Sequence, residues 1–188
     1  MNWNPHLELE GRHAFLSPSG YHWLNYEDDK LVEVYNNEKA KQEGTELHDL
    51  AAKLIDKGIR PEDDGTTFSL YVRDAVYYKM DPEIPLKYSE KCFGRADAIS
   101  FRRNLLRIHD LKTGTTKASE KQLYVYAALF CLEYKHKPKD IKIECRIYQN
   151  NQVQIYIPEP DEITAIMKNI IHKNRILCKL DTEDKLDL

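Results

Sequence analysis

The chain has 188 residues, of which 41% are hydrophobic and 31% charged, and its formal net charge is −3. This length favours one domain whose core needs neither disulfides nor a structural metal, and the composition excludes a disordered polypeptide. Because no apolar run is long enough to span a membrane and the first residues lack the pattern of a signal peptide, we expect a cytoplasmic protein.

The four cysteines, Cys92, Cys131, Cys145 and Cys178, are far apart in the sequence and form no Cys-x-x-Cys pair. Zinc and iron–sulfur ligation therefore receive no support from their spacing. Each cysteine has apolar neighbours, which predicts four reduced thiols in the core.

Positive charge is concentrated in one part of the chain. From Arg102 to Lys142 there are ten Lys or Arg and four Asp or Glu, a local charge of +6 that leaves −9 for the rest. Charge runs are usually solvated surfaces, so this run indicates a nucleic-acid partner only because it surrounds Asp110 and Lys112.

The sequence before residue 80 predicts helices. Turn-forming residues in LSPSGYHWLNY start a short aromatic helix that Ser17 or Ser19 would cap. The stretch GTELHDLAAKLIDKG has one apolar stripe, with Thr45 as its cap and Gly58 as its end. After a loop, FSLYVRDAVYYKM is apolar enough to be a helix or a strand, and a helix is favoured.

From Pro85 the pattern becomes that of strands. The segments LKYSEKCFG, RADAISF and LLRIHDLK alternate in polarity and are separated by Gly94 and by the basic turn RRN. This arrangement predicts a meander of three strands.

The rest of the chain adds two helices and a hairpin. A loop, TGTTKA, precedes a helix between Ser119 and Pro138. The strands IKIECRIYQ and QVQIYIP surround the turn NN, and DEITAIMKNIIHKNRILCKL forms a closing amphipathic helix. The predicted class is α/β or α+β, with a central mixed β-sheet flanked by helices.

The residues that carry chemistry gather in FGRADAISFRRNLLRIHDLKTG. Side chains two apart in a strand point the same way, so Asp110 and Lys112 project together while Leu111 points into the core. The basic turn would bring Asp97 alongside Asp110, and Gly94 would permit close backbone approach. Adjacent carboxylates repel unless a cation separates them, which predicts Mg²⁺ or Mn²⁺ at this place.

Each of these features also has an ordinary explanation. An Asp-x-Lys pair on an exposed strand is usually a surface ion pair. Ser119-x-x-Gln122 matches a capping box, and Tyr126, on the same face of its helix, matches a core residue. His48 alone is more often a satisfied surface or core histidine. These explanations do not account for a helix that begins directly after the Asp-Leu-Lys loop.

The motifs GRAD, HDLK and QLYVY resemble those of the PD-(D/E)XK nuclease superfamily, in particular its RecB-like exonuclease branch with a Gln-x-x-x-Tyr signature. GTELHDLA supplies the upstream histidine of that branch, and LSPSGYHWL resembles the opening of phage and prophage members. The resemblance extends from about Ser17 to Tyr126, although each motif alone is weak. It implies one domain over residues 1–188 with a restriction-endonuclease-like core at about 40–160 and a closing helix at about 160–180.

The resemblance also implies a set of metal ligands. Asp97 would be the central ligand and Asp110 the second carboxylate, where many relatives have Glu. The carbonyl of Leu111 would complete the shell, and His48 would ligate a second ion. Some members carry an iron–sulfur cluster on one early and three late cysteines, and because this chain lacks that spacing we predict no cluster.

Three further residues would complete the catalytic site by the same resemblance. Lys112 would orient the attacking water and counter the charge on the phosphate, and Gln122 and Tyr126 would position the water, the lysine or the scissile strand. The family often has one more acidic residue before the Gly-x-x-Asp strand. Glu83 and Glu90 both remain candidates.

The implied function is hydrolysis of phosphodiester bonds in DNA by a water activated by one or two Mg²⁺ or Mn²⁺ ions. An exonuclease in phage or bacterial recombination, replication or repair is favoured over an endonuclease, with a homo-oligomer or a recombination protein as a further partner. Arg102, Arg103, Lys117 and Lys121 would flank the cleft and contact phosphates. The alternative is a non-catalytic module of the same fold that binds DNA or a protein.

Overall fold

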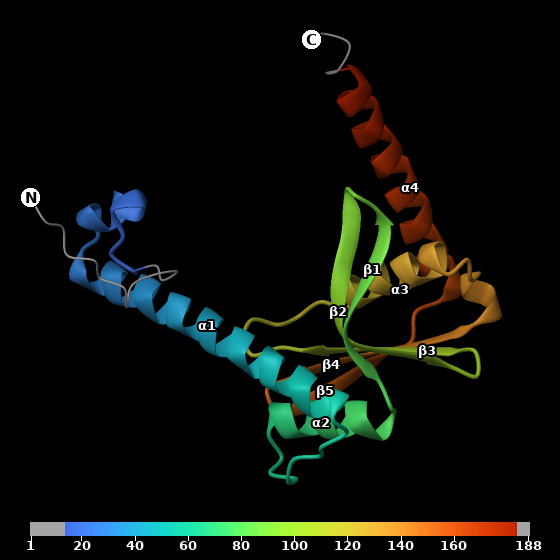
Figure 1. Cartoon of the computed structure of the whole chain (residues 1–188), viewed down its shortest axis with the longest axis horizontal. Helices are drawn as coiled ribbons and strands as arrows, with labels where there is room; N and C mark the ends of the chain where they lie inside the picture. The colour runs from blue at the N-terminus through green and yellow to red at the C-terminus, as the bar shows by residue number, and fades with distance from the viewer. Residues whose placement is uncertain (1–13, 184–188) are drawn as a thin grey trace, which may run out of the picture. The chain divides into compact units, whose positions relative to one another are not determined.

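The computed structural model describes residues 14–183, and the chain forms two compact units, Met1–Thr45 and Glu46–Leu188. The 3-10 helix η2 (Pro18–Asn25) lies in the first unit, and helix α1 (Asp28–Asp56) has residues in both. The other elements, all in the second unit (Figure 1), are α2 (Thr67–Tyr77), β1 (Asp81–Ser89), β2 (Cys92–Arg102), β3 (Leu105–Leu111), α3 (Lys121–Glu133), η3 (Pro138–Asp140), β4 (Lys142–Gln149), β5 (Gln152–Tyr156) and α4 (Pro160–Glu183).

The five strands form one mixed sheet in the order β1-β2-β3-β4-β5. The first three strands are antiparallel neighbours, which confirms the predicted meander. β4 then pairs in parallel with β3, and β5 pairs antiparallel with β4. Parallel neighbours need a long crossover connection, and here that connection contains α3. The predicted mixed sheet flanked by helices is therefore confirmed.

Two of the predicted turns in the sheet are confirmed and one is wrong. In the turns Arg103–Asn104 and Asn150–Asn151 every residue has a φ between 52° and 59°, the left-handed geometry of two-residue hairpin turns. Gly94, by contrast, lies inside β2 and pairs with Leu86. The chain reverses instead at residues 90–91, between β1 and β2.

Helix α1 is longer than the sequence predicted. It begins at Asp28, so Thr45 lies inside the helix and is not its cap; the Thr45 hydroxyl donates a hydrogen bond to the Lys41 carbonyl at 3.1 Å. The single glycine at position 44 costs a helix only about 1 kcal/mol, which is too little to end it. The predicted C-terminal end of the helix is confirmed, because Gly58, with a φ of +65°, follows the last helical turn.

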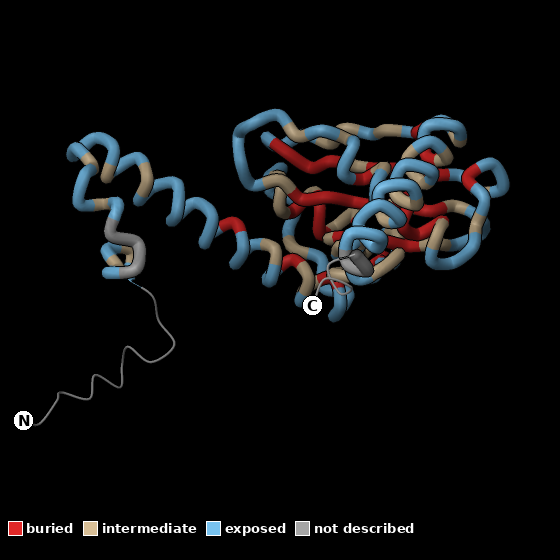
Figure 2. The backbone as a smooth tube through the Cα atoms, turned by 90° about the horizontal axis from the view of Figure 1, so that it is seen from above, coloured by how far each residue is buried: buried red, intermediate tan, exposed pale blue. Residues whose placement is uncertain are grey.

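Two apolar cores lie on opposite faces of the sheet. Figure 2 shows that much of the buried backbone is in the strands. Ile147 and Tyr148 are neighbours in β4 yet belong to different cores, because successive strand side chains point to opposite faces. The core under α3 and α4 includes Leu86, Ala96, Leu106, Ile108, Leu123, Ala127 and Ile163. The core under α2 and the last turns of α1 includes Ala51, Ile55, Tyr71, Val72, Ala75 and Leu111.

The cysteines are all free, as the sequence predicted, but they do not all lie in the core. Cys131 and Cys145 are buried, and burial raises the pKa of these thiols to about 11 and about 12. Cys178 is exposed on α4, so its predicted place in the core is wrong. Among the described residues, no helix is both long enough and apolar enough to cross a lipid bilayer.

Candidate active site

Two carboxylates meet where β2 and β3 lie side by side. The register pairs Ala98 with His109, so Asp97 and Asp110, the next residues along, leave neighbouring strands at the same level. The Asp97 carboxylate is fixed there because its Oδ2 atom accepts a hydrogen bond from the Leu111 backbone N–H at 2.9 Å. The Asp97 and Asp110 side chains are only 16% and 4% exposed, so both negative charges are held largely away from water.

Burial controls the ionisation of both groups. It raises the pKa of Asp110 to about 6; the charge on Asp97 adds to this rise, and Lys112 opposes it. Burial also raises the pKa of Asp97, with His48 as the main opposing group. Water would solvate these carboxylates better than the protein does, so the site favours a bound cation.

Lys112 lies directly beside this carboxylate pair. Its Nζ atom is 3.1 Å from Asp110 Oδ2, which is the contact that the strand period predicts for residues two apart. Asp110 Oδ2 is buried, and its contact with Lys112 is an ion pair. The backbone N–H of Lys112 donates to the Tyr148 carbonyl at 2.9 Å, which fixes the lysine to β4.

Gln122 binds the lysine and does not cap its own helix. Lys112 Nζ donates a hydrogen bond to Gln122 Oε1 at 2.9 Å. Helix α3 begins at Lys121, with Glu120 at the cap position and no side-chain cap bond, so the capping-box alternative for Ser119 and Gln122 is wrong. The helix begins later than that box requires, which leaves the glutamine amide available to Lys112.

A third acidic residue joins Asp97 from the neighbouring strand β1. Ligand atoms of His48, Glu83 and Asp97 all lie within 4.8 Å of one another, and His48 Nδ1 is 3.5 Å from Asp97 Oδ2. These three residues, called the carboxylate–imidazole cluster below, could hold a metal ion. Glu90, the other acidic candidate, lies in the β1–β2 turn and forms an ion pair with Lys87.

Glu83 has an unusual backbone conformation. Its φ is +52°, a left-handed value that is uncommon for a residue other than glycine and costs on the order of 1 kcal/mol or more. Burial raises the pKa of Glu83, the charge on Asp97 raises it further, and His48 lowers it. The strand therefore carries a strained residue at the point where its carboxylate approaches the cluster.

The donor set suits a divalent transition or alkaline-earth ion. Carboxylate oxygens favour Mg²⁺ and Mn²⁺, and the imidazole of His48 favours Mn²⁺ over Mg²⁺. Of the predicted ligands, the structure brings His48 and Asp97 together with Glu83, while Asp110 lies beside Asp97 and pairs with Lys112. Leu111 contacts Asp97 through its N–H group, and the ligand role of its carbonyl stays a prediction.

Tyr126 lies one turn beyond Gln122 on α3 and packs on the backbone of β2. A Cβ atom added to Gly94 would lie 2.9 Å from the Tyr126 ring atom Cε1, which is closer than real Cβ contacts allow. Gly94 therefore makes the close approach that the sequence predicted, and the ring takes the space of the missing side chain. This contact holds the helix against the strand that carries Asp97.

The predicted phosphate contacts lie in three different places. Arg102 and Arg103 lie at the far end of β2, five residues or more from Asp97, which is about 16 Å along an extended strand. The structure thus does not bring them to the carboxylates. Lys117 is exposed in the loop before α3, and Lys121 lines a pocket between α3 and α4.

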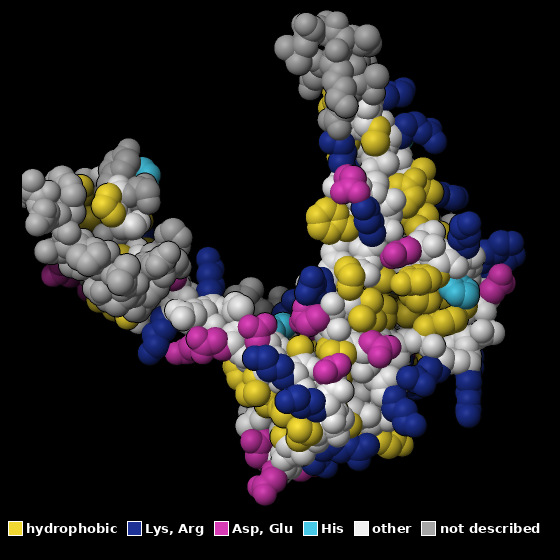
Figure 3. Space-filling view, viewed as in Figure 1, with side chains coloured by type: hydrophobic (Ala, Val, Ile, Leu, Met, Phe, Trp, Pro, Cys, Tyr) yellow, Lys and Arg dark blue, Asp and Glu magenta, His cyan; other side chains and the backbone are white. Residues whose placement is uncertain are grey.

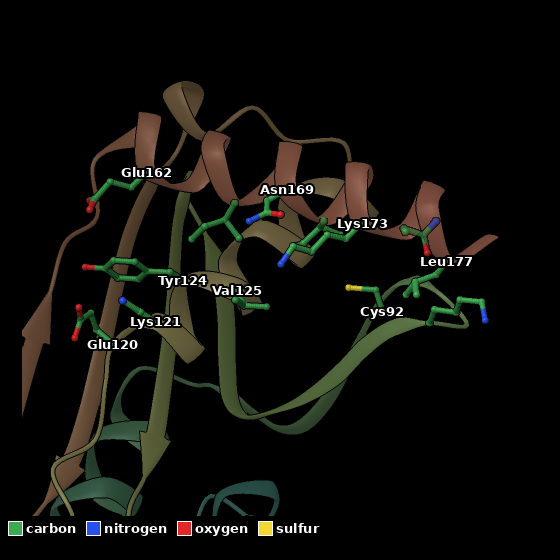
Figure 4. A pocket seen from close by; sticks show the side chains of 13 residues that line it. Cys92, Glu120, Lys121, Tyr124, Val125, Glu162, Asn169, Lys173 and Leu177 are labelled. Carbon is green, nitrogen blue, oxygen red and sulfur yellow. The ribbon is translucent and has the colours of Figure 1, made fainter. Parts of the chain in front are cut away.

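Sequence reasoning did not find that pocket, which has a volume of about 630 Å³. Figure 4 shows Tyr124 and Val125 of α3 across from Asn169 of α4, with Cys92 of β2 nearby. The lining comes from three elements that are distant in the sequence, so no local pattern signals it.

A smaller pocket of about 390 Å³ adjoins Lys112. Hydroxyl and amide side chains line much of it, among them Thr66, Thr113 and Asn151. Asn151 Oδ1 accepts a hydrogen bond from the Thr67 backbone N–H at 2.9 Å, so the β4–β5 turn is tied to the start of α2. The pocket gives the lysine a neighbouring polar cavity.

A buried polar network that the sequence did not predict supports the strand behind Asp110. His109 Nδ1 lies 3.1 Å from the Tyr148 hydroxyl, which donates a hydrogen bond to Asp74 Oδ2 at 2.7 Å. Arg146 donates to the same carboxylate oxygen at 2.9 Å. Burial, together with nearby arginines, lowers the pKa of His109 well below its ordinary value, so the ring is neutral. The network joins β3, β4 and α2.

Comparison with protein families, with curated proteins and with solved structures finds no match to this chain.

Proposed function

We propose that this chain is a metal-dependent nuclease that hydrolyses phosphodiester bonds in DNA. The observation that carries the proposal is the position of Lys112, whose Nζ atom contacts both Asp110 and Gln122 beside the carboxylate–imidazole cluster. Residues from α1, β1, β2, the end of β3 and α3 contribute to this one place. A surface ion pair would need none of these other residues, and its lysine would not be held on two sides.

The charges of the site support a divalent cation as the cofactor. Burial raises the pKa of Glu83, Asp97 and Asp110, and neighbouring cationic groups oppose the rise at each of them. The carboxylate–imidazole cluster would hold the ion, and Asp110 lies beside it. When bound, Mn²⁺ or Mg²⁺ would supply Lewis-acid stabilisation of the charge that develops on the phosphodiester.

The side chains of the chain itself would perform the positioning. Gln122 holds the Lys112 ammonium group by a hydrogen bond, and Asp110 holds it from the other side by charge. An ammonium group fixed in this way counters negative charge on a phosphate without first having to reorganise. Tyr126 keeps α3, and with it Gln122, against β2.

The pocket beside Lys112 supports a nucleic acid as the substrate. Its threonine and asparagine side chains offer hydrogen bonds of the kind that sugar and phosphate groups accept. The resemblance of the motifs favours DNA ends, and so an exonuclease.

The test uses linear DNA labelled at one end, beside a covalently closed circle, with Mn²⁺, Mg²⁺ or a chelator. We expect metal-dependent degradation of the linear DNA and an intact circle. Asp97→Asn should abolish cleavage, whereas Glu90→Gln, which removes the same charge from an exposed turn, should keep it. Cutting of the circle would contradict the exonuclease assignment. If the unmodified chain cuts neither substrate with either ion, the nuclease proposal is wrong and the non-catalytic module is favoured.

A further inference from the structure

A second charged region lies where β2 ends and β3 begins. Here a groove of about 980 Å³ opens between three turns: the α2–β1 turn, the β2–β3 turn and the segment that leads into β4. Figure 3 shows Lys and Arg side chains gathered at the lower right-hand edge, around the β2–β3 turn of Figure 1. The six cationic residues that line this basic groove are Lys79, Arg102, Arg103, Arg107, Lys139 and Lys142.

The groove carries an excess of positive charge that the chain itself does not neutralise. Of the part of the chain that the structure describes, Asp140 is the one acidic residue in the groove lining. Arg107 forms an ion pair with Glu144 at 3.1 Å, but Arg103, Lys139 and Lys142 have no acidic partner within 4.0 Å among residues 14–183. This contrasts with the net charge of −3 for the chain. The groove is therefore a local site for anions on a protein that is acidic overall.

The turns that form the groove are held in place. The Lys142 backbone N–H donates to the Asn104 carbonyl at 2.7 Å, which joins the start of β4 to the β2–β3 turn. Arg102 donates to the Lys79 carbonyl at 3.2 Å, which joins the same turn to the end of α2. Arg107 lies over the Tyr78 ring, with its Cζ atom 4.3 Å from the ring centroid. The cationic groups are thus carried by a fixed frame and need little ordering when an anion binds.

The spread of the charges indicates an extended anion. A single phosphate is held by one or two cations, whereas these six come from separate elements around an open groove: the α2–β1 turn, the end of β2 and the turn after it, β3, η3 and the start of β4. Among the described residues, no aromatic side chain lines the groove, and its apolar lining is limited to Leu105 and Ile141. It therefore lacks the aromatic anchors of protein interfaces and of base-stacking surfaces. A chain of phosphates meets these conditions, because each phosphate needs only a cation and no specific base contact.

We propose that the basic groove is a second DNA-binding site, which holds the phosphate backbone of the substrate about 16 Å from the carboxylates. This inference rests on the proposed function and adds to it the path of the substrate beyond the reacting phosphate. The groove binds without regard to base sequence, and the candidate active site performs the chemistry. Substrate that reaches both sites is then held more firmly than substrate that reaches only one.

The test measures binding without cleavage, by fluorescence anisotropy of a labelled duplex in chelator over a series of KCl concentrations. The groove variant carries Arg103→Gln, Lys139→Gln and Lys142→Gln, three exposed residues outside the candidate active site. The matched control carries Lys168→Gln, Arg175→Gln and Lys179→Gln, which remove the same charge from exposed positions of α4. Equal thermal unfolding of the two variants shows that both are folded.

We expect the groove variant to bind more weakly and to have a shallower slope of log K against log salt. The magnitude of this negative slope should decrease by about 0.9 for each phosphate that the groove no longer neutralises, which is a total decrease of about 3 for the three substitutions. The control should keep the slope of the unmodified chain. Equal slopes for all three proteins, or no DNA binding by the unmodified chain, would overturn the proposal. Displacement of the DNA by polyglutamate, added at the same concentration of negative charge, would also overturn the proposal. The groove would then bind anions in general.

The outcome is separate from that of the cleavage assay. If the unmodified chain cuts no DNA but the groove variant alone loses salt-dependent binding, the proposal that the groove binds DNA is supported and the nuclease proposal is wrong. If the chain cuts DNA and the groove variant binds like the control, the nuclease proposal is supported and the proposal that the groove binds DNA is wrong.

Discussion

The candidate active site and the basic groove carry opposite charges, and they carry them in different ways. In the candidate active site Asp97 and Asp110 are largely buried, and a lysine, a histidine and a glutamine lie beside them. In the basic groove Arg103, Lys139 and Lys142 are exposed. Buried like charges are costly and need a partner, so the carboxylate pair is the stronger indication of a specific site. Exposed charges cost little, and only their number and arrangement carry information.

The largest expected effect is that of replacing Lys112 in the candidate active site by methionine, and the same replacement of Lys142 in the basic groove serves as the comparison. Lys112→Met should lower the cleavage rate at saturating DNA by about 10²- to 10³-fold, because a fixed cation beside the phosphate is removed. Lys142→Met should leave that rate almost unchanged and should raise KM, because it removes an interaction that substrate and transition state share. Steady-state kinetics on long linear DNA measures both. A rate loss of equal size in the two variants would show that the candidate active site and the basic groove do not have separate roles.

A second difference should appear in the pH dependence of stability without metal. The pKa of Asp110 rises from 3.8 to about 6 in the folded chain, so between these values the folded state binds more protons than the unfolded state. The Asp110 carboxyl should therefore contribute a fall in the free energy of unfolding, of at most about 3 kcal/mol, as pH rises through this window. Urea unfolding in chelator at a series of pH values measures this fall.

Asp110→Asn should remove most of this fall, and the variant should be more stable than the unmodified chain above pH 6. The substitution Asp140→Asn, in the basic groove, is the control and should leave the pH dependence unchanged. An unmodified chain whose stability is constant through the window would contradict the buried position of Asp110.

Metal binding should distinguish the carboxylate–imidazole cluster from an acidic residue outside it. A cation that binds only the folded chain, at a free concentration of about 100 Kd, should stabilise it by about 2.7 kcal/mol and raise Tm by about 5 to 10 °C. Glu83→Gln should lose most of this shift with Mn²⁺, whereas Glu90→Gln should keep it, because only Glu83 lies in the carboxylate–imidazole cluster. Thermal unfolding with and without Mn²⁺ measures this shift in Tm. An equal shift in the two variants would show that Glu83 is not a metal ligand.

The smallest effect concerns packing. Gly94→Ala should destabilise the fold by about 1 to 2 kcal/mol, because the new methyl group would meet the Tyr126 ring. Gly114→Ala is the matched control, since nothing lies within 4 Å of its added Cβ atom. In Tyr126→Ala, which removes the ring, the cost of Gly94→Ala should largely disappear. Chemical unfolding of the single and double variants gives this coupling, and additive costs would exclude the contact.

Much of the local structure follows from patterns within single segments. Alternating polarity places Asp110 and Lys112 on one side of their strand, and the structure has them in contact. The turn at Arg103–Asn104 and the end of α1 near Gly58 follow equally from local backbone preferences. The prediction from the local sequence is wrong at Thr45. Its preference for a cap position is weak, and the residue lies inside the longer helix α1.

Relations between segments were decided only by the tertiary structure. The sequence left Glu83 and Glu90 as alternatives, and the pairing of β1 with β2 places Glu83 beside Asp97 and Glu90 in the turn. The spacing to Ser119 matched a helix cap at Gln122, but the packing of α3 gives that side chain to Lys112. A short motif fixes directions within one element, whereas distances between elements depend on strand register and helix packing, which involve the whole chain.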